Sequence, residues 1–324
     1  MNKRIVAVVV TYNRLSALRR TLSHLLTQPL HAIVVVDNAS TDGTQAFLAD
    51  QVDERVHVLT LPENLGGAGG FHAGVDYAHT HLDYDYLLLQ DDDAWPEGAE
   101  WSQFIHSDWF PDAVATAVYY PSGTICPMNR PGWHPFKNWR QTWRTLLHGA
   151  QGFHVSPSHF QAAEATEVDF SSFVGLLVHR KVVDAVGTPD PDWFIYGDDV
   201  DYTLRMRKAG FSLLFVPWLR YIHDCETFIE KTKVYAPAWK VYFHYRNLVM
   251  IYRRVSGILF WLVMVAKLPQ WLFWARHYPK SERLLYLRLL KLAMMDGLRN
   301  DRSRTLQDIK AFCQLTYSPK ASPD

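Results

Sequence analysis

Cysteine is scarce in this chain of 324 residues, which contains only Cys126, Cys225 and Cys313. Three widely separated thiols are too few for a disulfide framework or a cysteine-based zinc site, and they fit a reducing compartment. Long apolar runs are also missing near the start, where Ile5 to Val10 is too short for the core of a signal peptide. Because 48% of the residues are hydrophobic and 20% are charged, we expect a sizeable core and exclude global disorder.

Two common nucleotide-binding motifs are absent as well. The chain contains no G-x-x-x-x-G-K-[ST] sequence, and its glycine-rich stretch Gly66–Gly70 does not match the dinucleotide pattern, because His72 occupies the sixth position counted from Gly67. The stretch therefore has two interpretations. Its glycines could let a nucleotide sugar approach the backbone closely, or they could form a simple tight turn.

Charge is balanced overall but unevenly distributed along the chain. Residues 1–235 contain 18 Lys and Arg against 28 Asp and Glu, whereas residues 236–324 contain 15 against 5. This asymmetry predicts two domains, an acidic body over residues 1–235 and a basic helical tail over residues 236–324.

The basic tail is expected to bind an anionic surface. Its charges are interleaved with Trp, Leu and Phe, and its longest uncharged run, from Val255 to Ala266, is shorter than the ~20 residues of a membrane-spanning helix. This pattern favours amphipathic helices lying on a membrane and makes a nucleic-acid partner less attractive. The alternative is a helical subdomain packed on the body, with its basic groups merely solvated.

The first 90 residues alternate between buried strands and helical spacing. This order predicts an α/β fold with a mostly parallel sheet, covered by helices on both faces. The expected strands are Ile5–Val10, Ala32–Val36, Val56–Leu61 and Tyr84–Gln90. Ligands of such sheets bind beyond the carboxyl ends of the strands, where Asp37 and the triplet Asp91–Asp93 are expected.

The acidic triplet is the strongest candidate for a metal site. In an extended segment, Asp91 and Asp93 point the same way and Asp92 points elsewhere. Two converging carboxylates suit Mg²⁺ or Mn²⁺, and His223 could complete a mixed oxygen and nitrogen site, which favours Mn²⁺. The alternatives are a solvated acidic loop and a structural histidine.

Asp198 and Asp199 open a predicted helix over residues 198–208. Either residue could cap this helix, because aspartate is favoured at helix N-termini. The other could then face the cleft and accept a proton from an attacking hydroxyl group. We predict Asp199 as the base, with Asp198 as the less favoured candidate.

Several motifs together resemble the GT-A fold glycosyltransferases of family two over about residues 4–226. The triplet, the stretch Phe194–Tyr202 and His223 are most similar to bacterial galactofuranosyltransferases, while related rhamnosyltransferases share most of the scaffold. The motifs are Thr11-Tyr12-Asn13-Arg14, Asp37-Asn38-Ala39-Ser40, Asn64-Leu65-Gly66-Gly67 with Gly69-Gly70, and Asp91-Asp92-Asp93.

This resemblance implies roles for the matching residues. Asp91, Asp93 and His223 would hold the metal ion, and Asp199 would be the base of an inverting transfer. Asp37 would lie near the uracil ring of a UDP-sugar, and Asp92 would touch its ribose or sugar. The remaining residues of the donor pocket would be Thr11, Tyr12, Asn13, Arg14, Asn64 and Gly69.

The expected activity is transfer of galactofuranose from UDP-galactofuranose to a lipid-linked or oligosaccharide acceptor. A cell-surface polysaccharide such as O-antigen would be the product, made by a peripheral enzyme on the cytoplasmic face of the membrane.

Polymerising members of the family carry an additional N-terminal domain, so one or a few sugar additions are expected here. Trp133–Trp143 could form an acceptor wall or simply pack. The alternatives are a rhamnosyltransferase or other hexosyltransferase, and a non-catalytic nucleotide-sugar-binding assembly protein.

Overall fold

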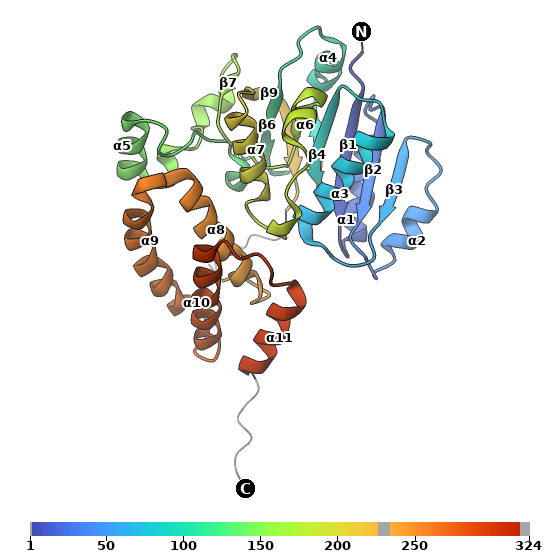
Figure 1. Ribbon diagram of the computed structural model, residues 1–324. Helices are drawn as coiled ribbons and strands as arrows, with labels where there is room; N and C mark the ends of the chain where they lie inside the picture. Colours follow the sequence, from blue (N-terminus) through green and yellow to red (C-terminus); the bar gives the residue numbers. More distant parts are fainter. Residues whose placement is uncertain (1, 226–233, 318–324) are drawn as a thin grey trace. The chain divides into compact units, whose positions relative to one another are not determined.

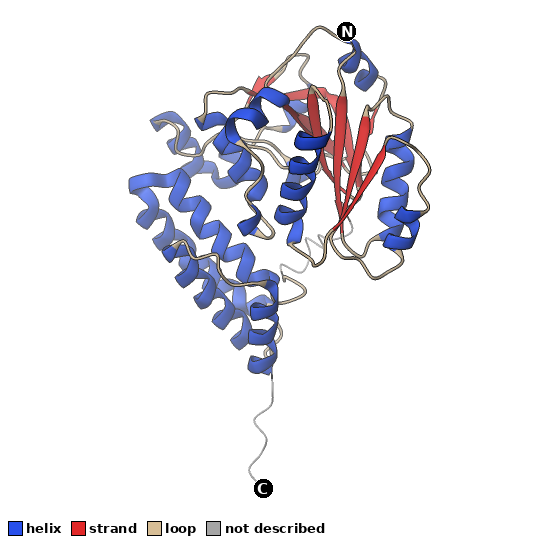
Figure 2. Cartoon of the chain, turned by 45° about the vertical axis from the view of Figure 1, so that its right-hand side comes forward, coloured by secondary structure: helices blue, strands red, loops and turns tan. Residues whose placement is uncertain are grey.

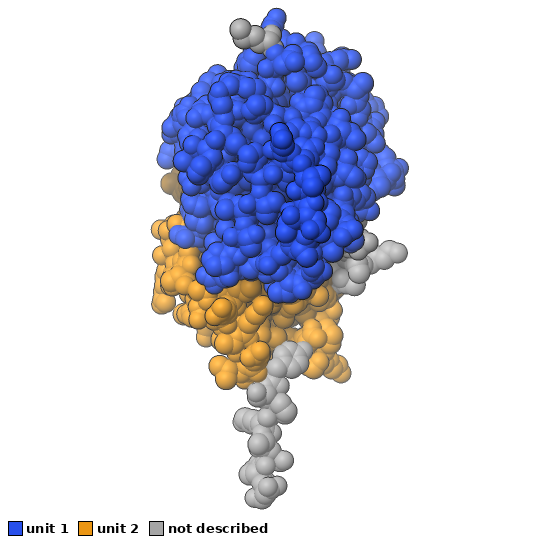
Figure 3. Space-filling view, turned by 90° about the vertical axis from the view of Figure 1, so that its right-hand side faces the viewer, with its two compact units in different colours: residues 1–194, 198–225 blue, residues 195–197, 226–324 orange. Residues whose placement is uncertain are grey.

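The computed structural model describes residues 2–225 and 234–317 (Figure 1). The chain divides into two units (Figure 3). Unit 1 comprises residues 1–194 and 198–225, and unit 2 comprises residues 195–197 and 226–324. Unit 1 thus ends at Cys225. The short segment Ile195–Gly197 groups with the helical unit, although in the sequence it lies between two parts of unit 1.

Unit 1 is built on a nine-stranded mixed sheet with strand order β3-β2-β1-β4-β8-β6-β9-β5, in which β7 pairs with β9. Strands β3, β2, β1 and β4 are mutually parallel, and β6 is parallel to β9. The strands are β1 (Ile5–Thr11), β2 (Ala32–Asp37), β3 (Val56–Thr60), β4 (Tyr86–Asp91), β5 (Ala94–Glu97), β6 (Ala113–Tyr119), β7 (Thr166–Glu167), β8 (Leu176–His179) and β9 (Leu213–His223).

Helices cover both faces of this sheet (Figure 2). Alternate residues of β1 enter opposite cores, as the period of two along a strand requires: Val6 and Val8 lie in one core, and Ile5 and Val9 lie in the other. The predicted α/β architecture is therefore confirmed. The helices of this unit are α1 (Leu15–Leu26), α2 (Thr44–Ala49), α3 (Gly66–His81), α4 (Glu100–His106), α5 (Trp139–His148), α6 (Arg180–Val186) and α7 (Asp198–Lys208).

The glycine-rich stretch forms the first turns of helix α3, which begins at Gly66, and is not a separate tight turn. Glycine is a poor helix former, at about 1 kcal/mol less favourable than alanine. A Cβ atom added at Gly70 would lie 2.4 Å from Val10 Cγ1, so the missing side chain lets α3 pack directly on β1. Gly66, with φ of +72°, leads into the helix in a conformation that other residues adopt only with strain.

Strand β9 runs through Pro217, which cannot donate a ladder hydrogen bond, and carries His223 as its last residue. The structure accommodates the proline with a shift in the β6–β9 register between Thr116 and Ala117. The strand then resumes and delivers His223 to the edge of the sheet.

Unit 2 consists of helices packed around a buried polar and aromatic centre. Tyr242 donates a hydrogen bond of 2.8 Å to Asp296, and Tyr286 donates one of 2.7 Å to the carbonyl of Trp271. The helices are α8 (Lys240–Ser256), α9 (Phe260–Trp274), α10 (Arg283–Arg299) and α11 (Leu306–Tyr317).

One stretch of unit 2 is long and apolar enough to cross a membrane. Lys240–His277 comprises 38 residues, which include α8, a turn at Gly257 and α9, and its most apolar window has a mean hydropathy of 1.7 and is 33% buried. It alone meets these criteria among the described residues. Length and composition support a span only weakly, because buried core helices can meet the same criteria.

Candidate functional site

The parallel strands deliver three groups of predicted site residues to one edge of the sheet. Thr11, the last residue of β1, lies opposite Asp37, the last residue of β2. On the other side of β1, Val10 lies opposite Asp91, the last residue of β4. The edge predicted to bind ligand therefore carries the hydroxyl group of Thr11 and the carboxylates of Asp37 and Asp91, each from a different strand.

Asp91, Asp93 and His223 come together at this edge. One potential ligand atom from each lies within 4.8 Å of the other two. His223 Nε2 is 3.1 Å from Asp93 Oδ1 and 3.9 Å from Asp91 Oδ2. The pairing of β5 with β9 explains this convergence, because Ala94, which follows the triplet, lies opposite His223.

Asn129 determines which nitrogen of His223 faces the carboxylates. Its side-chain Nδ2 donates to Ser172 Oγ at 2.9 Å, so its Oδ1 faces His223 Nδ1 at 2.8 Å. An amide oxygen only accepts, so Nδ1 must carry a proton and Nε2 is left to face Asp93. Metal-ligating histidines are commonly oriented through their second nitrogen in this way.

The two carboxylates of the cluster are stabilised by a nearby positive charge. Burial lowers the pKa of His223, but Asp93 and Asp91 outweigh it and raise that pKa to about 10. Asp93 Oδ1 is buried and has no hydrogen-bond partner among the described residues. Either a proton on His223 Nε2 or a divalent cation can satisfy this group. The two carboxylates and the imidazole therefore fit Mn²⁺ or Mg²⁺.

Asp92 faces away from this cluster, as alternation along the chain predicts. It is buried, accepts a hydrogen bond of 2.7 Å from Thr11 Oγ1, and pairs at 3.0 Å with Arg14. The second amino group of Arg14 lies 2.6 Å from Asp93 Oδ2. Burial raises the pKa of Asp92 to about 7 despite the nearby arginine. Contact between Asp92 and a donor sugar stays a prediction.

Asp37 keeps one buried carboxylate oxygen available for a ligand. Its Oδ1 accepts from the Ser40 backbone at 3.0 Å, while its Oδ2 has no hydrogen-bond partner in the described part of the chain. Nearby, Asn13 adopts a left-handed φ of 53° and accepts a 2.6 Å hydrogen bond from the Thr41 backbone, and Tyr12 is exposed. These contacts tie the loops after β1 and β2 together.

Asn64 and Gly69 have visible structural roles at the start of α3. Asn64 Oδ1 accepts a hydrogen bond of 2.8 Å from the Gly66 backbone, and Gly69 leaves room for Leu65, whose Cβ would lie 2.4 Å from an added methyl group. Their predicted contact with the donor is not tested by these interactions.

Asp198 and Asp199 are the first residues of α7. The backbone just before them is strained, because Phe194 and Tyr196 have φ of 63° and 68°. Burial raises the pKa of Asp199 to about 6, and the charge of Asp91 adds to this effect. Burial and the charge of Asp199 raise the pKa of Asp198 well above its ordinary value. Asp199 is therefore mostly ionised near neutral pH, and its Oδ1 accepts a hydrogen bond from the Val200 backbone at 2.7 Å. Its role as the base stays a prediction.

The tryptophans proposed as an acceptor wall divide into two groups. Trp133 is held by a hydrogen bond of 2.8 Å from its Nε1 to the Glu167 carbonyl. Trp139 and Trp143 lie on α5 and are 69% and 59% exposed. Their contact with an acceptor stays a prediction.

Sequence reasoning missed Asn129 and the ion pairs of Arg14 with the triplet. Asn129 ends a short 3₁₀ turn, Pro127–Asn129, within an irregular region, and no periodic pattern identifies it. Arg14 was expected only in the donor pocket. Its position between Asp92 and Asp93 could have been found by pairing the loop after β1 with the end of β4.

Comparisons with known proteins agree with this geometry. The family profile "Glycosyl transferase family 2" matches residues 6–185. Galactofuranosyltransferase GlfT1 of Mycolicibacterium smegmatis is 29% identical over 227 residues, covering 69% of this chain and 72% of that protein. The dTDP-rhamnosyl transferase RfbF of Shigella flexneri is 24% identical over 315 residues, covering 92% and 97%.

A crystal structure of GalNAc-T7 with UDP, GalNAc and Mn²⁺ superposes with a TM-score of 0.53 at 16% sequence identity. The match covers 76% of this chain and 51% of that one, so the chain spans about half the length of this structural neighbour. A likeness at this identity shows the fold alone, and that fold is GT-A.

Proposed function

Because the chain belongs to glycosyltransferase family 2, we propose that it is a metal-dependent inverting enzyme acting on a nucleotide-sugar donor. The acceptor is a hydroxyl group of a lipid-linked or polysaccharide molecule. The observation that carries this proposal is the convergence of Asp91, Asp93 and His223, with Asp199 close enough for the charge of Asp91 to raise its pKa.

The proposed reaction is a single displacement at the anomeric carbon. The acceptor oxygen forms the new glycosidic bond while the bond to the diphosphate breaks, and Asp199 accepts the acceptor proton. Asp91, Asp93 and His223 would hold Mn²⁺ or Mg²⁺, which supplies positive charge that stabilises the departing diphosphate. The Mn²⁺ and UDP in the GalNAc-T7 crystal structure support this assignment.

Galactofuranose, delivered by UDP-galactofuranose, is the proposed sugar. The relation to galactofuranosyltransferase GlfT1 supports this choice. Rhamnose is the second candidate, because RfbF matches over 92% of this chain. A cell-surface glycan such as O-antigen is the proposed product in either case.

The donor can be identified with purified full-length protein, Mn²⁺ and a lipid-linked acceptor. UDP-galactofuranose, dTDP-rhamnose and other nucleotide sugars would each be tested for nucleotide release and for product linkage by NMR. Transfer from UDP-galactofuranose alone is expected. Transfer only from dTDP-rhamnose would replace the proposed sugar, whereas tight UDP binding without release would favour a non-catalytic binding protein.

The proposed base can be tested by Asp199→Asn, with Asp192→Asn as a matched control that removes an exposed carboxylate upstream of α7. Loss of general-base catalysis lowers turnover by about 10²–10⁴-fold. We expect that loss in Asp199→Asn, with UDP affinity retained. Turnover near the native rate in a folded Asp199→Asn protein would remove Asp199 from this role.

We also propose that unit 2 associates peripherally with the cytoplasmic face of the cell membrane. Large apolar side chains in or next to α9 are exposed to solvent, and burying each in an apolar phase contributes about 1.5–3 kcal/mol. These side chains are Ile258, Trp261, Leu262, Val265, Leu272 and Phe273.

Membrane association can be measured by co-sedimentation with vesicles containing phosphatidylglycerol. Trp261→Glu combined with Val265→Glu should reduce binding, whereas Val52→Glu, at a residue 93% exposed in unit 1, should not. Extraction of the native protein from membranes by alkaline carbonate is expected for a peripheral protein. Resistance to carbonate would instead indicate that part of Lys240–His277 spans the membrane.

A further inference from the structure

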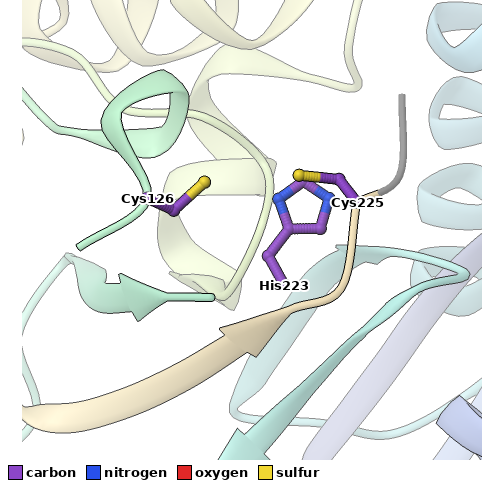
Figure 4. A group of neighbouring side chains, drawn as sticks. All are labelled: Cys126, His223 and Cys225. Atoms are coloured by element: carbon purple, nitrogen blue, oxygen red, sulfur yellow. The ribbon is translucent and has the colours of Figure 1, made fainter. Parts of the chain in front are cut away.

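A second group of potential metal ligands lies beside the proposed Mn²⁺ site. Cys126, His223 and Cys225 each offer one ligand atom within 4.8 Å of the other two. Figure 4 shows both sulfur atoms turned toward the imidazole ring. The wide spacing of the cysteines in the sequence argues against such a cluster, but the fold brings two of them to one histidine.

Two structural elements create this group. Cys126 is fully buried just after β6, where its backbone N–H donates to the Val118 carbonyl at 3.0 Å. Cys225 is partly exposed and lies two residues beyond His223, the last residue of β9. All three residues belong to unit 1, so the group does not depend on the placement of unit 2.

The chemistry of this group differs from that of the acidic cluster. Two thiolates and an imidazole are soft to borderline ligands, which select Zn²⁺ over Mg²⁺ and Mn²⁺. Two further donors are adjacent, since Met128 Sδ lies 3.6 Å from Cys225 Sγ and Asn129 Oδ1 lies 3.0 Å from Cys126 Sγ. Ligand atoms around a tetrahedral zinc ion are about 3.5–4 Å apart, so only small movements are needed.

His223 presents a different nitrogen to each group. Its Nδ1 and Cys126 Sγ both contact Asn129 Oδ1, so Cys126 lies on the Nδ1 side of the ring. Its Nε2 faces Asp93 at 3.1 Å. One imidazole therefore separates a thiol-rich site from a carboxylate-rich site.

We propose that Cys126, His223 and Cys225 form a Zn²⁺ site that opposes metal binding at Asp91 and Asp93. On zinc binding, each thiol and the Nδ1 position of the imidazole release a proton to solvent, and the proton on Nε2 stays in place. The Nε2–H then donates to Asp93 Oδ1, so the acidic cluster loses its nitrogen ligand. Zinc binding itself stands independently, whereas the antagonism rests on the proposed function of the acidic cluster.

Zinc binding can be tested on the full-length, phosphine-reduced, metal-free protein. Co²⁺ serves as a coloured probe, because thiolate ligands give it a charge-transfer absorption, and Zn²⁺ affinity follows from competition with a chromophoric chelator. We expect one equivalent in the native protein, weakened at least about tenfold in Cys126→Ser and Cys225→Ser. Cys313→Ser, in unit 2, is the matched control and should bind as the native protein does.

Cys225→Ser is the decisive variant, because its side chain is partly exposed and its loss should not disturb the core as Cys126→Ser could. Absence of the thiolate absorption in the reduced native protein would overturn the proposal. Equal zinc affinity in native and Cys225→Ser proteins would overturn it as well. Formation of a Cys126–Cys225 disulfide without any zinc binding by the reduced form would count against it in the same way.

The antagonism is measured separately, by electron paramagnetic resonance of free Mn²⁺. Zinc should weaken Mn²⁺ binding in the native and Cys313→Ser proteins but not in Cys225→Ser. Asp91→Asn separates the two proposals, because it should abolish Mn²⁺ binding and leave the thiolate–Co²⁺ absorption intact. If Asp91→Asn abolishes zinc binding while Cys225→Ser retains it, zinc simply occupies the acidic cluster and the second site does not exist.

Discussion

Replacing Asn129 with alanine should weaken metal binding without removing any metal ligand. The substitution deletes the acceptor that holds the His223 Nδ1 proton at 2.8 Å. The imidazole would then be free to rotate, so Nε2 would no longer be fixed toward Asp93. Loss of such an orienting partner costs about 10–100-fold in metal affinity, or roughly 1.4–2.7 kcal/mol.

The structure provides graded controls for this effect. Ser172→Ala removes the group that accepts from Asn129 Nδ2, so it should loosen the amide without deleting Oδ1 and cost less than Asn129→Ala. Asn129→Asp retains an acceptor toward His223 Nδ1 and should recover most of the affinity. This rescue distinguishes orientation of the imidazole from simple loss of packing.

The assay is Mn²⁺ titration of the protein without donor, followed by electron paramagnetic resonance. Metal-free UDP binding and the midpoint of urea denaturation would confirm that the variants are folded. Affinities for Mn²⁺ within twofold of each other in native and Asn129→Ala proteins would refute the reasoning. An Asn129→Asp variant weaker than Asn129→Ala would refute it as well.

Three further predictions follow from the pKa values and the packing. Asp199 must be deprotonated to act as a base, and its pKa is about 6. The rate of sugar transfer should therefore fall as the pH drops through 6. Asp199→Asn should remove this dependence from the pH–rate profile. Metal-free His223 has a pKa of about 10, so Mn²⁺ must displace a proton from it. The affinity for Mn²⁺ measured between pH 6 and 9 should therefore rise about tenfold per pH unit. An affinity that does not change with pH would exclude His223 as a ligand. Gly70→Ala should lower the free energy of unfolding by about 1–3 kcal/mol in urea denaturation, because its Cβ would lie 2.4 Å from Val10, whereas Gly67→Ala, with nothing within 4 Å, should be neutral or stabilising.

The carboxylate side of the site could be predicted because its placement depends on short-range patterns. Continuous apolar runs identify β1, β2 and β4, and parallel pairing then brings Thr11, Asp37 and Asp91 to one edge. The alternation of Asp91 and Asp93 follows from strand geometry alone. These features need no knowledge of the remaining chain.

The histidine side could not be derived in the same way. His223 reaches the site because β9 continues beyond Pro217 through a register shift, which local propensity does not predict. Asn129 lies 94 residues from His223 in the sequence, in a region without periodic hydrophobicity. Side-chain contacts at this separation depend on the complete fold, so the sequence offers His223 only as a candidate ligand, which the resemblance strengthens, and does not indicate Asn129 at all.

The approach to Asp199 shows the same dependence on distant residues. The side chain of Asn247, in α8, donates hydrogen bonds of 2.7 and 2.8 Å to the carbonyls of Ile195 and Tyr196. These bonds hold the segment immediately before Asp198 in a conformation where Tyr196 has a φ of 68°. Strain of this kind persists only where surrounding contacts impose it. Asn247 and Ile195–Gly197 group in the same unit, so this backbone conformation is imposed by contacts between residues 51 and 52 positions apart in the sequence, which no local pattern indicates.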